Sequence, residues 1–136
     1  MLFRSLSVKM RIGGRSVAAA GSRTFHRSDP YKGDVVSIAP AGDVRDALAS
    51  VEAARSAFPG WAASSPRVRR DVLLRYAALL HSHESALIEL MVSETGGTVA
   101  WAHFNVELAA SFALEAAAQV YAPMGEVLPT DQPGVR

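Results

Sequence analysis

Apolar residues recur at helical spacing through most of the chain after Asp43. Asp43 is a good N-cap residue, and the apolar positions after it predict a first helix that ends at Pro59-Gly60. Ser65-Pro66 predicts the start of a second helix, because proline at the first helical position loses no N–H group that the helix needs. Two further helices are predicted, one near residues 84–93 with Gly96-Gly97 as its stop and one over about residues 98–122.

The fourth of these helices is apolar on two sides. One stripe contains Trp101, Asn105, Leu108 and Phe112, and a second consists mostly of small residues: Ala102, Val106, Ala109, Ala113, Ala117 and Val120. A helix that is apolar nearly all round normally lies inside something larger. The three preceding helices can cover one face, so covering the other requires residues absent from this chain or a partner.

Turn-forming residues divide the segment before the helices. The pattern predicts a hairpin with residues 11–17 on one arm, a turn at Gly21-Ser22 and residues 24–26 on the return. A short strand, residues 35–38, follows and is closed by Pro40. The chain thereby divides into a basic N-terminal extension (1–9), a β-hairpin and strand region (10–42), a four-helix region (43–122) and the start of an extended segment (123–136).

Composition places the chain among ordinary soluble globular domains. It has 136 residues, of which 49% are hydrophobic and 20% charged, with a formal net charge of +1. This balance indicates neither a nucleic-acid partner nor an anionic membrane surface, and no uninterrupted apolar stretch is long enough to span a bilayer. Residues 1–28 carry six cations and no acid, a composition found in organellar transit peptides. The hairpin is the favoured interpretation, and we expect a cytoplasmic protein.

Few residues offer chemistry of their own. The chain has no cysteine, which excludes disulfides and a thiolate nucleophile. His81 and His83 lie two residues apart on a helix and diverge by about 200°, so the sequence predicts no metal site there. Glu94, at a helix end, is expected to hold the turn by hydrogen bonds. Trp101 and Phe104 fit either core packing or a pocket wall. No glycine-rich nucleotide loop is present, and the chain alone is expected to bind no cofactor.

Several short motifs, in order along residues 10–136, resemble the aldehyde dehydrogenase family. Each is weak alone, but together they form a specific pattern: Ile12-Gly13-Gly14, then Asp29-Pro30 with Gly33-Asp34-Val35-Val36, then Ala54 to Trp61, and finally Glu94-Thr95-Gly96. Asp29 departs from the family pattern, in which asparagine is commoner. The resemblance implies an aldehyde dehydrogenase-like α/β fold. This chain would be an incomplete, mostly α-helical part of that fold, with an N-terminal β-hairpin and a C-terminal extended segment.

Three further segments resemble the branch of the family that acts on aromatic aldehydes, namely the benzaldehyde, salicylaldehyde and vanillin dehydrogenases. They are residues 101–106, residues 115–117 and residues 125–134. In that branch the long helix borders the substrate tunnel. The resemblance therefore implies Trp101, Asn105 and Leu108 as candidates for contact with an aromatic ring.

The family reaction is NAD- or NADP-dependent oxidation of an aldehyde to the carboxylic acid through a cysteine thiolate. The resemblance implies that the catalytic groups and the cofactor site lie downstream of this chain, so we expect an N-terminal fragment that is not catalytic in isolation. Its partner would be the remainder of the aldehyde dehydrogenase fold or an oligomer. The alternative is a stand-alone helical module for protein interaction or assembly.

Overall fold

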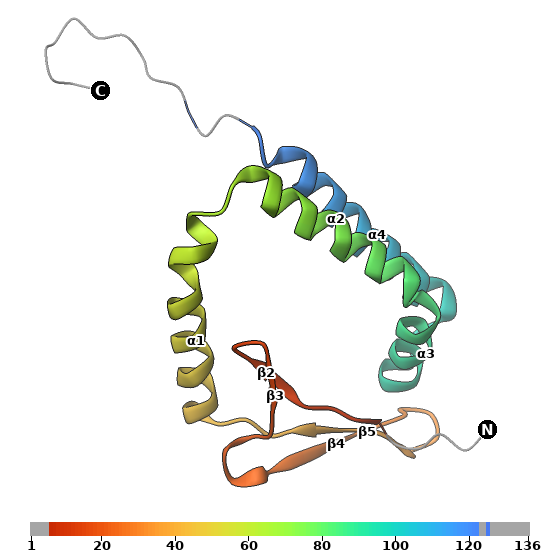
Figure 1. The fold of residues 1–136 in the computed structure, drawn as a ribbon. Helices are drawn as coiled ribbons and strands as arrows, with labels where there is room; N and C mark the ends of the chain where they lie inside the picture. Colours follow the sequence, from red (N-terminus) through yellow and green to blue (C-terminus); the bar gives the residue numbers. More distant parts are fainter. Residues whose placement is uncertain (1–5, 123–124, 126–136) are drawn as a thin grey trace, which may run out of the picture.

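A small β-region and four helices make up the fold in the computed structural model, which describes residues 6–122 and residue 125. The ribbon follows an open arc, with α1 on one side, the β-strands at the base and the pair α2 and α4 on the other side (Figure 1). The chain is mostly helical, as the sequence predicts. Apart from Gly125, the extended segment predicted from Gly125 to Pro129 lies outside the described residues.

A three-stranded sheet ties the two arms of the arc together. Its strand order is β1 (Leu6–Ser7), β5 (Val35–Pro40) and β4 (Thr24–Ser28), with β1 parallel and β4 antiparallel to β5. The backbone N–H of Val8 donates to the carbonyl of Ile38 at 3.0 Å. Residues 6–8, which the sequence places in an N-terminal extension, thus belong to the sheet.

The hairpin is shorter than the sequence predicts and has different arms. β2 (Met10–Ile12) pairs antiparallel with β3 (Arg15–Val17) around Gly13-Gly14, and both glycines have positive φ, of 58° and 77°. Two-residue hairpin loops favour glycine for this reason. The predicted return arm, residues 24–26, pairs instead with β5. The prediction failed because it placed the turn at Gly21-Ser22, which lies in a short 3₁₀ turn.

Helix α1 (Val44–Ala62) begins as predicted but runs past its predicted end. Asp43 caps it, accepting from Arg45 N at 2.9 Å, while the Asp46 carboxylate accepts from Asp43 N at 2.9 Å. Pro59 removes only one donor, and the last turn continues because Ala63 N donates to Pro59 O at 3.1 Å. The prediction that Pro59-Gly60 ends the helix was wrong.

The connection from α1 to α2 (Pro66–Ser82) is held by one arginine. The Arg69 guanidinium donates to the carbonyls of Ala62 at 2.8 Å and Trp61 at 3.3 Å, and it lies 5.9 Å from the Trp61 ring centroid. These carbonyls lie at the negative end of the α1 dipole, so a cation is favourable there. Ser65 caps α2, as the sequence predicts.

Helix α3 (Glu84–Thr95) follows α2 after one residue, and α4 (Val99–Gln119) follows α3 after a glycine turn. Gly96 ends α3 in the left-handed conformation, with φ of 70°. Thr98 caps α4 by accepting from Trp101 N at 3.1 Å. Both boundaries agree with the sequence, although α4 ends three residues before the predicted Ala122.

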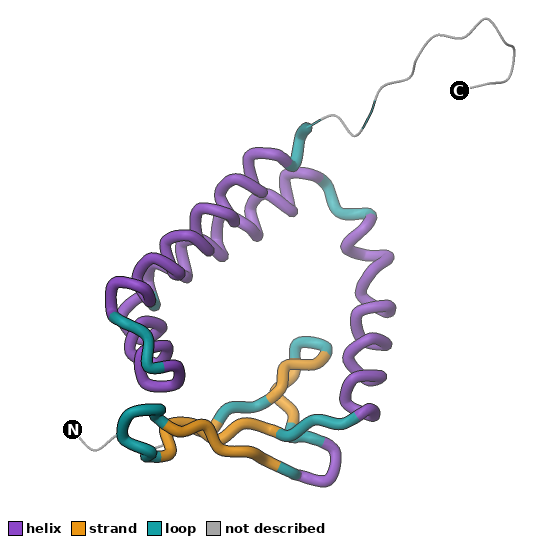
Figure 2. Tube along the Cα trace, turned by 180° about the vertical axis from the view of Figure 1, so that it is seen from behind, coloured by secondary structure: helices purple, strands orange, loops and turns teal. Residues whose placement is uncertain are grey.

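One face of α4 is buried and the other is exposed. The buried residues are small, namely Ala102, Val106, Ala110, Ala113 and Ala117, and they pack against α2 and α3. On the opposite stripe Trp101 is 57% exposed and Phe112 66%. The expectation that three preceding helices share the packing was wrong, because α1 lies across the arc from α4 (Figure 2).

Helix α1 has no buried residue. Its large apolar side chains, Val44, Leu48, Val51, Phe58 and Trp61, are between 49% and 74% exposed. The helices in the described range include none that is both long and apolar enough to cross a bilayer.

Candidate functional site

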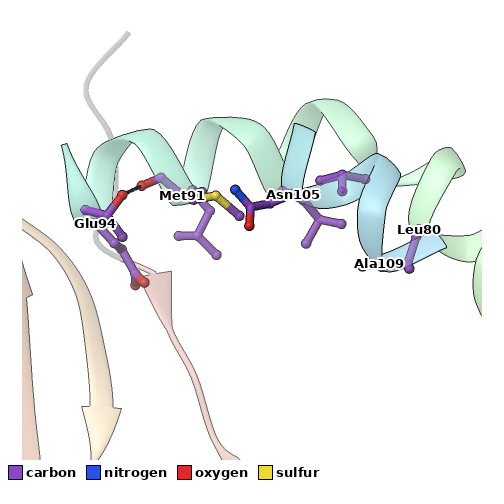
Figure 3. Close-up of a pocket in the computed structure, with 9 residues that line it drawn as sticks. Leu80, Met91, Glu94, Asn105 and Ala109 are labelled. Carbon is purple, nitrogen blue, oxygen red and sulfur yellow. Dashed lines mark hydrogen bonds between the residues drawn. The ribbon is translucent and has the colours of Figure 1, made fainter. Parts of the chain in front are cut away.

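An apolar pocket lies where α3 meets α2 and α4. It has a volume of about 310 Å³. Its lining comes from all three helices: Leu80 of α2, then Leu87, Leu90, Met91, Glu94 and Thr95 of α3, and Asn105, Val106 and Ala109 of α4. Figure 3 shows Glu94 at one end, Asn105 beside Met91 near the middle, and Leu80 and Ala109 at the other end. An apolar cavity with a few polar groups is the usual form of a small-molecule site.

Asn105 brings an amide to the middle of this pocket. Its Nδ2 donates to the carbonyl of Trp101, one turn earlier on α4, at 2.7 Å. This bond uses one amide N–H group, and an amide also has an oxygen that can accept. The structure therefore places this predicted site residue in the pocket lining, with its orientation fixed by its own helix.

Trp101 and Leu108 lie on the outer side of the same stripe. They are 57% and 36% exposed, and neither is among the residues that line the pocket. Trp101 stacks on Phe104, with ring centroids 5.5 Å apart and planes inclined by 27°. The three predicted residues thus share one helix without sharing one cavity in this chain.

Glu94 connects α3 to the sheet. Its Oε2 accepts from Arg27 Nη1 of β4 at 2.9 Å, and its Oε1 accepts from Ser37 Oγ of β5. Ser37 is only 1% exposed, so its hydroxyl needs this partner. The expected structural role holds, but the contacts differ from those predicted, because Glu94 joins elements distant in sequence and does not hold its own turn.

Other residues hold the turn between α3 and α4. Thr95 Oγ1 donates to Met91 O at 2.7 Å and accepts from Gly97 N at 3.2 Å. The Tyr31 hydroxyl donates to Gly96 O at 3.1 Å, which fixes the turn against the loop before β5. The pocket therefore has a rigid end that is anchored to the sheet.

The two neighbouring histidines have different surroundings. His81 Nδ1 lies 3.1 Å from Glu107 Oε1 on α4, whereas His83 Nδ1 lies 2.9 Å from the carbonyl of Leu79 on its own helix. Glu107 lies near His81, and Glu84 lies near His103, only because α2, α3 and α4 pack together. Sequence spacing gave no signal of this arrangement.

Comparison with known proteins identifies the family to which this chain belongs. The sequence model of the Aldehyde dehydrogenase family matches residues 17–136. The chain belongs to the aldehyde dehydrogenase family and matches its N-terminal region, and its aldehyde dehydrogenase-like fold is confirmed.

Curated relatives of the chain include enzymes named for aromatic aldehydes. A vanillin dehydrogenase of Pseudomonas fluorescens is 44% identical over 129 residues, covering 95% of this chain and 27% of the relative. A salicylaldehyde dehydrogenase of Pseudomonas putida is 35% identical, covering 93% and 26% respectively. The chain therefore spans about a quarter of the length of these relatives.

Solved structures show the same similarity. A salicylaldehyde dehydrogenase from Pseudomonas putida G7, complexed with salicylaldehyde, superposes with a TM-score of 0.91 at 32% identity, over 95% of this chain and 27% of that one. An NAD-dependent benzaldehyde dehydrogenase from Corynebacterium glutamicum gives 0.87 at 29% identity, over 93% and 28%. The arc of four helices and small sheet is thus a segment of a larger enzyme fold.

Proposed function

We propose that this chain forms the N-terminal helical part of an NAD(P)-dependent aldehyde dehydrogenase that oxidises an aromatic aldehyde to the acid. The observation that carries the proposal is the exposed stripe of α4, on which Trp101, Leu108 and Phe112 face away from α2 and α3. Relatives named for vanillin and salicylaldehyde support the aromatic substrate class.

The chain supplies packing and lining surfaces to that enzyme and no reacting group. It contains no cysteine to act as the nucleophile and no glycine-rich loop to hold the phosphates of the nicotinamide cofactor. The chain on its own is therefore proposed to carry out no chemical step. Mixing it with an aromatic aldehyde and NAD or NADP should produce no reduced cofactor, and protein-dependent formation of NADH would contradict the proposal.

The uncovered apolar faces support a role as part of a larger fold. Burying a large apolar side chain contributes about 1.5–3 kcal/mol relative to leaving it exposed. Leu48, Val51 and Phe58 on α1 and Phe112 on α4 forgo most of that gain in this chain, because each is at least 64% exposed. The remainder of the dehydrogenase fold is the proposed cover for both helices.

Trp101, Asn105 and Leu108 are the proposed contacts with the aromatic ring. An indole gives a ring a flat apolar face, and an amide can donate to or accept from a phenolic hydroxyl or an aldehyde oxygen. In the assembled enzyme these residues would form one wall of the substrate passage along α4.

The sheet supports the cytoplasmic interpretation of the basic N-terminal segment. β1 pairs with β5, and β2, β3 and β4 all lie before residue 29. Removing residues 1–28 as a transit peptide would delete four of the five strands that the described part of the chain contains. We therefore propose that this segment is part of the folded protein and that the protein is cytoplasmic.

A chimeric enzyme tests the proposed function. The region of the Pseudomonas fluorescens vanillin dehydrogenase that matches this chain is replaced by the chain, and NADH formation with vanillin is measured. We expect an active chimera in which Trp101→Ala raises KM roughly tenfold, since losing an aromatic contact of this kind costs about 1.4 kcal/mol. Asn105→Ala and Leu108→Ala should raise KM by smaller factors.

Tyr76→Ala is the matched control, because it removes an exposed aromatic side chain from α2. It should change KM for vanillin less than twofold. An active chimera whose KM is unchanged by all three α4 variants would exclude the proposed contacts while leaving the family role intact. An inactive chimera, together with a chain that melts cooperatively as a monomer and binds a specific partner, would favour the stand-alone helical module.

A further inference from the structure

A cluster of metal-ligating side chains lies on the outer surface where the corner between α2 and α3 meets α4. Glu84 is the first residue of α3, and His103 and Glu107 lie four residues apart on α4. One ligand atom from each of the three lies within 4.8 Å of the other two. Glu84 and His103 are 19 residues apart and belong to consecutive helices, so the packing of α3 against α4 assembles the group.

The helical spacing explains why the α4 residues converge. Residues four apart on a helix lie on the same face, so His103 and Glu107 both project toward the start of α3. Asn105 and Ala109, which line the pocket, lie about 200° around the helix from His103 and Glu107 respectively. The cluster is therefore separate from the pocket and from the proposed substrate wall.

One hydrogen bond and one close ionic contact already hold these side chains together. His103 Nδ1 contacts Glu84 Oε1, and His81 Nδ1 lies 3.1 Å from Glu107 Oε1. The side chains of Glu84 and Glu107 are 29% and 45% exposed, and that of His103 is 55% exposed. The group is thus oriented by its own contacts but open to solvent on one side.

We propose that Glu84, His103 and Glu107 bind a divalent transition-metal ion such as Zn²⁺. Bonds of about 2.1 Å in tetrahedral geometry separate the ligand atoms by about 3.4 Å, so small side-chain movements would bring these atoms to that spacing. One imidazole with two carboxylates suits Zn²⁺ better than Mg²⁺, which prefers oxygen ligands alone. The two carboxylates balance the charge of the ion, and water completes the coordination from the exposed side.

His81 acts as a positioning residue in this site. Its Nδ1 lies 3.1 Å from a carboxylate oxygen of Glu107, and outer-shell partners of this kind orient metal ligands and raise affinity. Since the three ligands come from α3 and α4, metal binding would link the two helices beyond the contacts they already make.

Zinc and cobalt titrations of the full 136-residue chain, without a polyhistidine tag, test the proposal. Calorimetry with ZnCl₂ should show one ion per chain. His103→Gln and Glu107→Gln should each weaken Zn²⁺ binding at least tenfold, and His81→Gln should weaken it by a smaller factor. Co²⁺ should give visible absorption bands that tenfold excess Mg²⁺ does not remove.

His83→Gln and His26→Gln are the matched controls. His83 belongs to the same corner but contacts the Leu79 carbonyl, and His26 lies on β4. Both variants should bind Zn²⁺ within twofold of the wild type, and far-UV circular dichroism should show that every variant retains its helices. Absence of Zn²⁺ binding, wild-type affinity in His103→Gln and Glu107→Gln, or displacement of Co²⁺ by Mg²⁺ would each overturn the proposal.

Discussion

Helices α1 and α4 have similar lengths and both carry apolar stripes, but only α4 of the two has buried residues. Five residues of α4 are buried, whereas α1 has none. The difference lies outside the helices themselves, because α2 runs beside α4, whereas no helix of the described residues runs beside α1 (Figures 1 and 2). Helical periodicity identifies the face that needs cover, but it does not show whether the same chain supplies that cover.

Side-chain size explains how α2 and α4 pack without large core residues. Ala77 of α2 lies in one buried cluster with Ala110 and Ala113 of α4, with Leu80 against it. Small residues let helix backbones approach closely, so a few alanines bury the whole contact. The apolar face of α1 carries large residues instead, among them Leu48 and Phe58, which suit a partner with deeper recesses.

Replacing a glycine by alanine should have opposite effects in the packed turn before α4 and on the exposed helix α1. Gly96→Ala, at the packed turn, should destabilise the chain by about 2–4 kcal/mol, since a left-handed residue with a Cβ costs about 1–2 kcal/mol and crowding adds to it. The new Cβ would lie 2.7 Å from atoms of both Pro30 and Tyr31. Urea denaturation followed by circular dichroism measures the change.

Gly60→Ala is the counterpart on α1. Gly60 is helical and its added Cβ would meet nothing within 4 Å, so the substitution should stabilise the helix by about 0.5–1 kcal/mol. Equal destabilisation by the two substitutions would show that α1 is packed against something in solution, contrary to the structure.

Enlarging an alanine gives the second contrast. Ala110→Leu on α4 should cost about 1–3 kcal/mol of unfolding free energy, because Ala110 is 1% exposed and the added methylenes would push α2 away. Ala54→Leu on α1 adds the same atoms to an exposed site and should change stability by less than about 0.5 kcal/mol. The same urea titration compares them.

A tolerated Ala110→Leu would contradict the close contact between α2 and α4. In the chimeric dehydrogenase Ala54→Leu should become destabilising as well, because Ala54 would then lie near the surface that the remaining fold covers. A loss of chimera stability with Ala54→Leu would therefore support the proposed cover of α1.

Local capping signals explain why most of the helix boundaries could be predicted. Asp43, Ser65 and Thr98 cap the starts of α1, α2 and α4, and Gly96 ends α3, because each acts on backbone groups within a few residues. The strand pairing was harder to predict. β4 pairs with β5 across the loop between Ser28 and Val35. The glycines at Gly13-Gly14 and Gly21-Ser22 also allow turns, so turn residues alone did not show which strands pair.

The candidate sites depend on contacts between distant residues, and these had no sequence signal. Helical spacing placed Trp101, Asn105 and Leu108 on one stripe, yet the path of α3 decides that only Asn105 lines the pocket. The group of Glu84, His103 and Glu107 needs the corner after α2 to reach α4. Glu94 likewise meets Ser37 only once the sheet has formed.

The smallest predicted effect is a difference in acid sensitivity between the N-caps of α1 and α4. The side-chain hydrogen bond from Arg45, with its backbone N–H and the charges of Arg45 and Arg23, holds the pKa of Asp43 below its usual value near 3.8. A lowered pKa stabilises the folded state above the unfolded value, and this stability is lost as pH falls through the folded value. The start of α1 should therefore loosen below about pH 3.8, whereas Thr98, the cap of α4, does not titrate.

Amide NMR shifts between about pH 6 and pH 2 measure this difference. The Arg45 amide, which donates to Asp43, should titrate with the carboxylate, and the Trp101 amide, which donates to the Thr98 hydroxyl, should not follow the same curve. Asp43→Asn keeps a side-chain cap without the charge, so it should remove the titration of the Arg45 amide while preserving the helix start. If both amides instead shifted together in the wild type, acid would be unfolding the whole chain, and the independence of α1 from the α2 and α4 pair would be wrong.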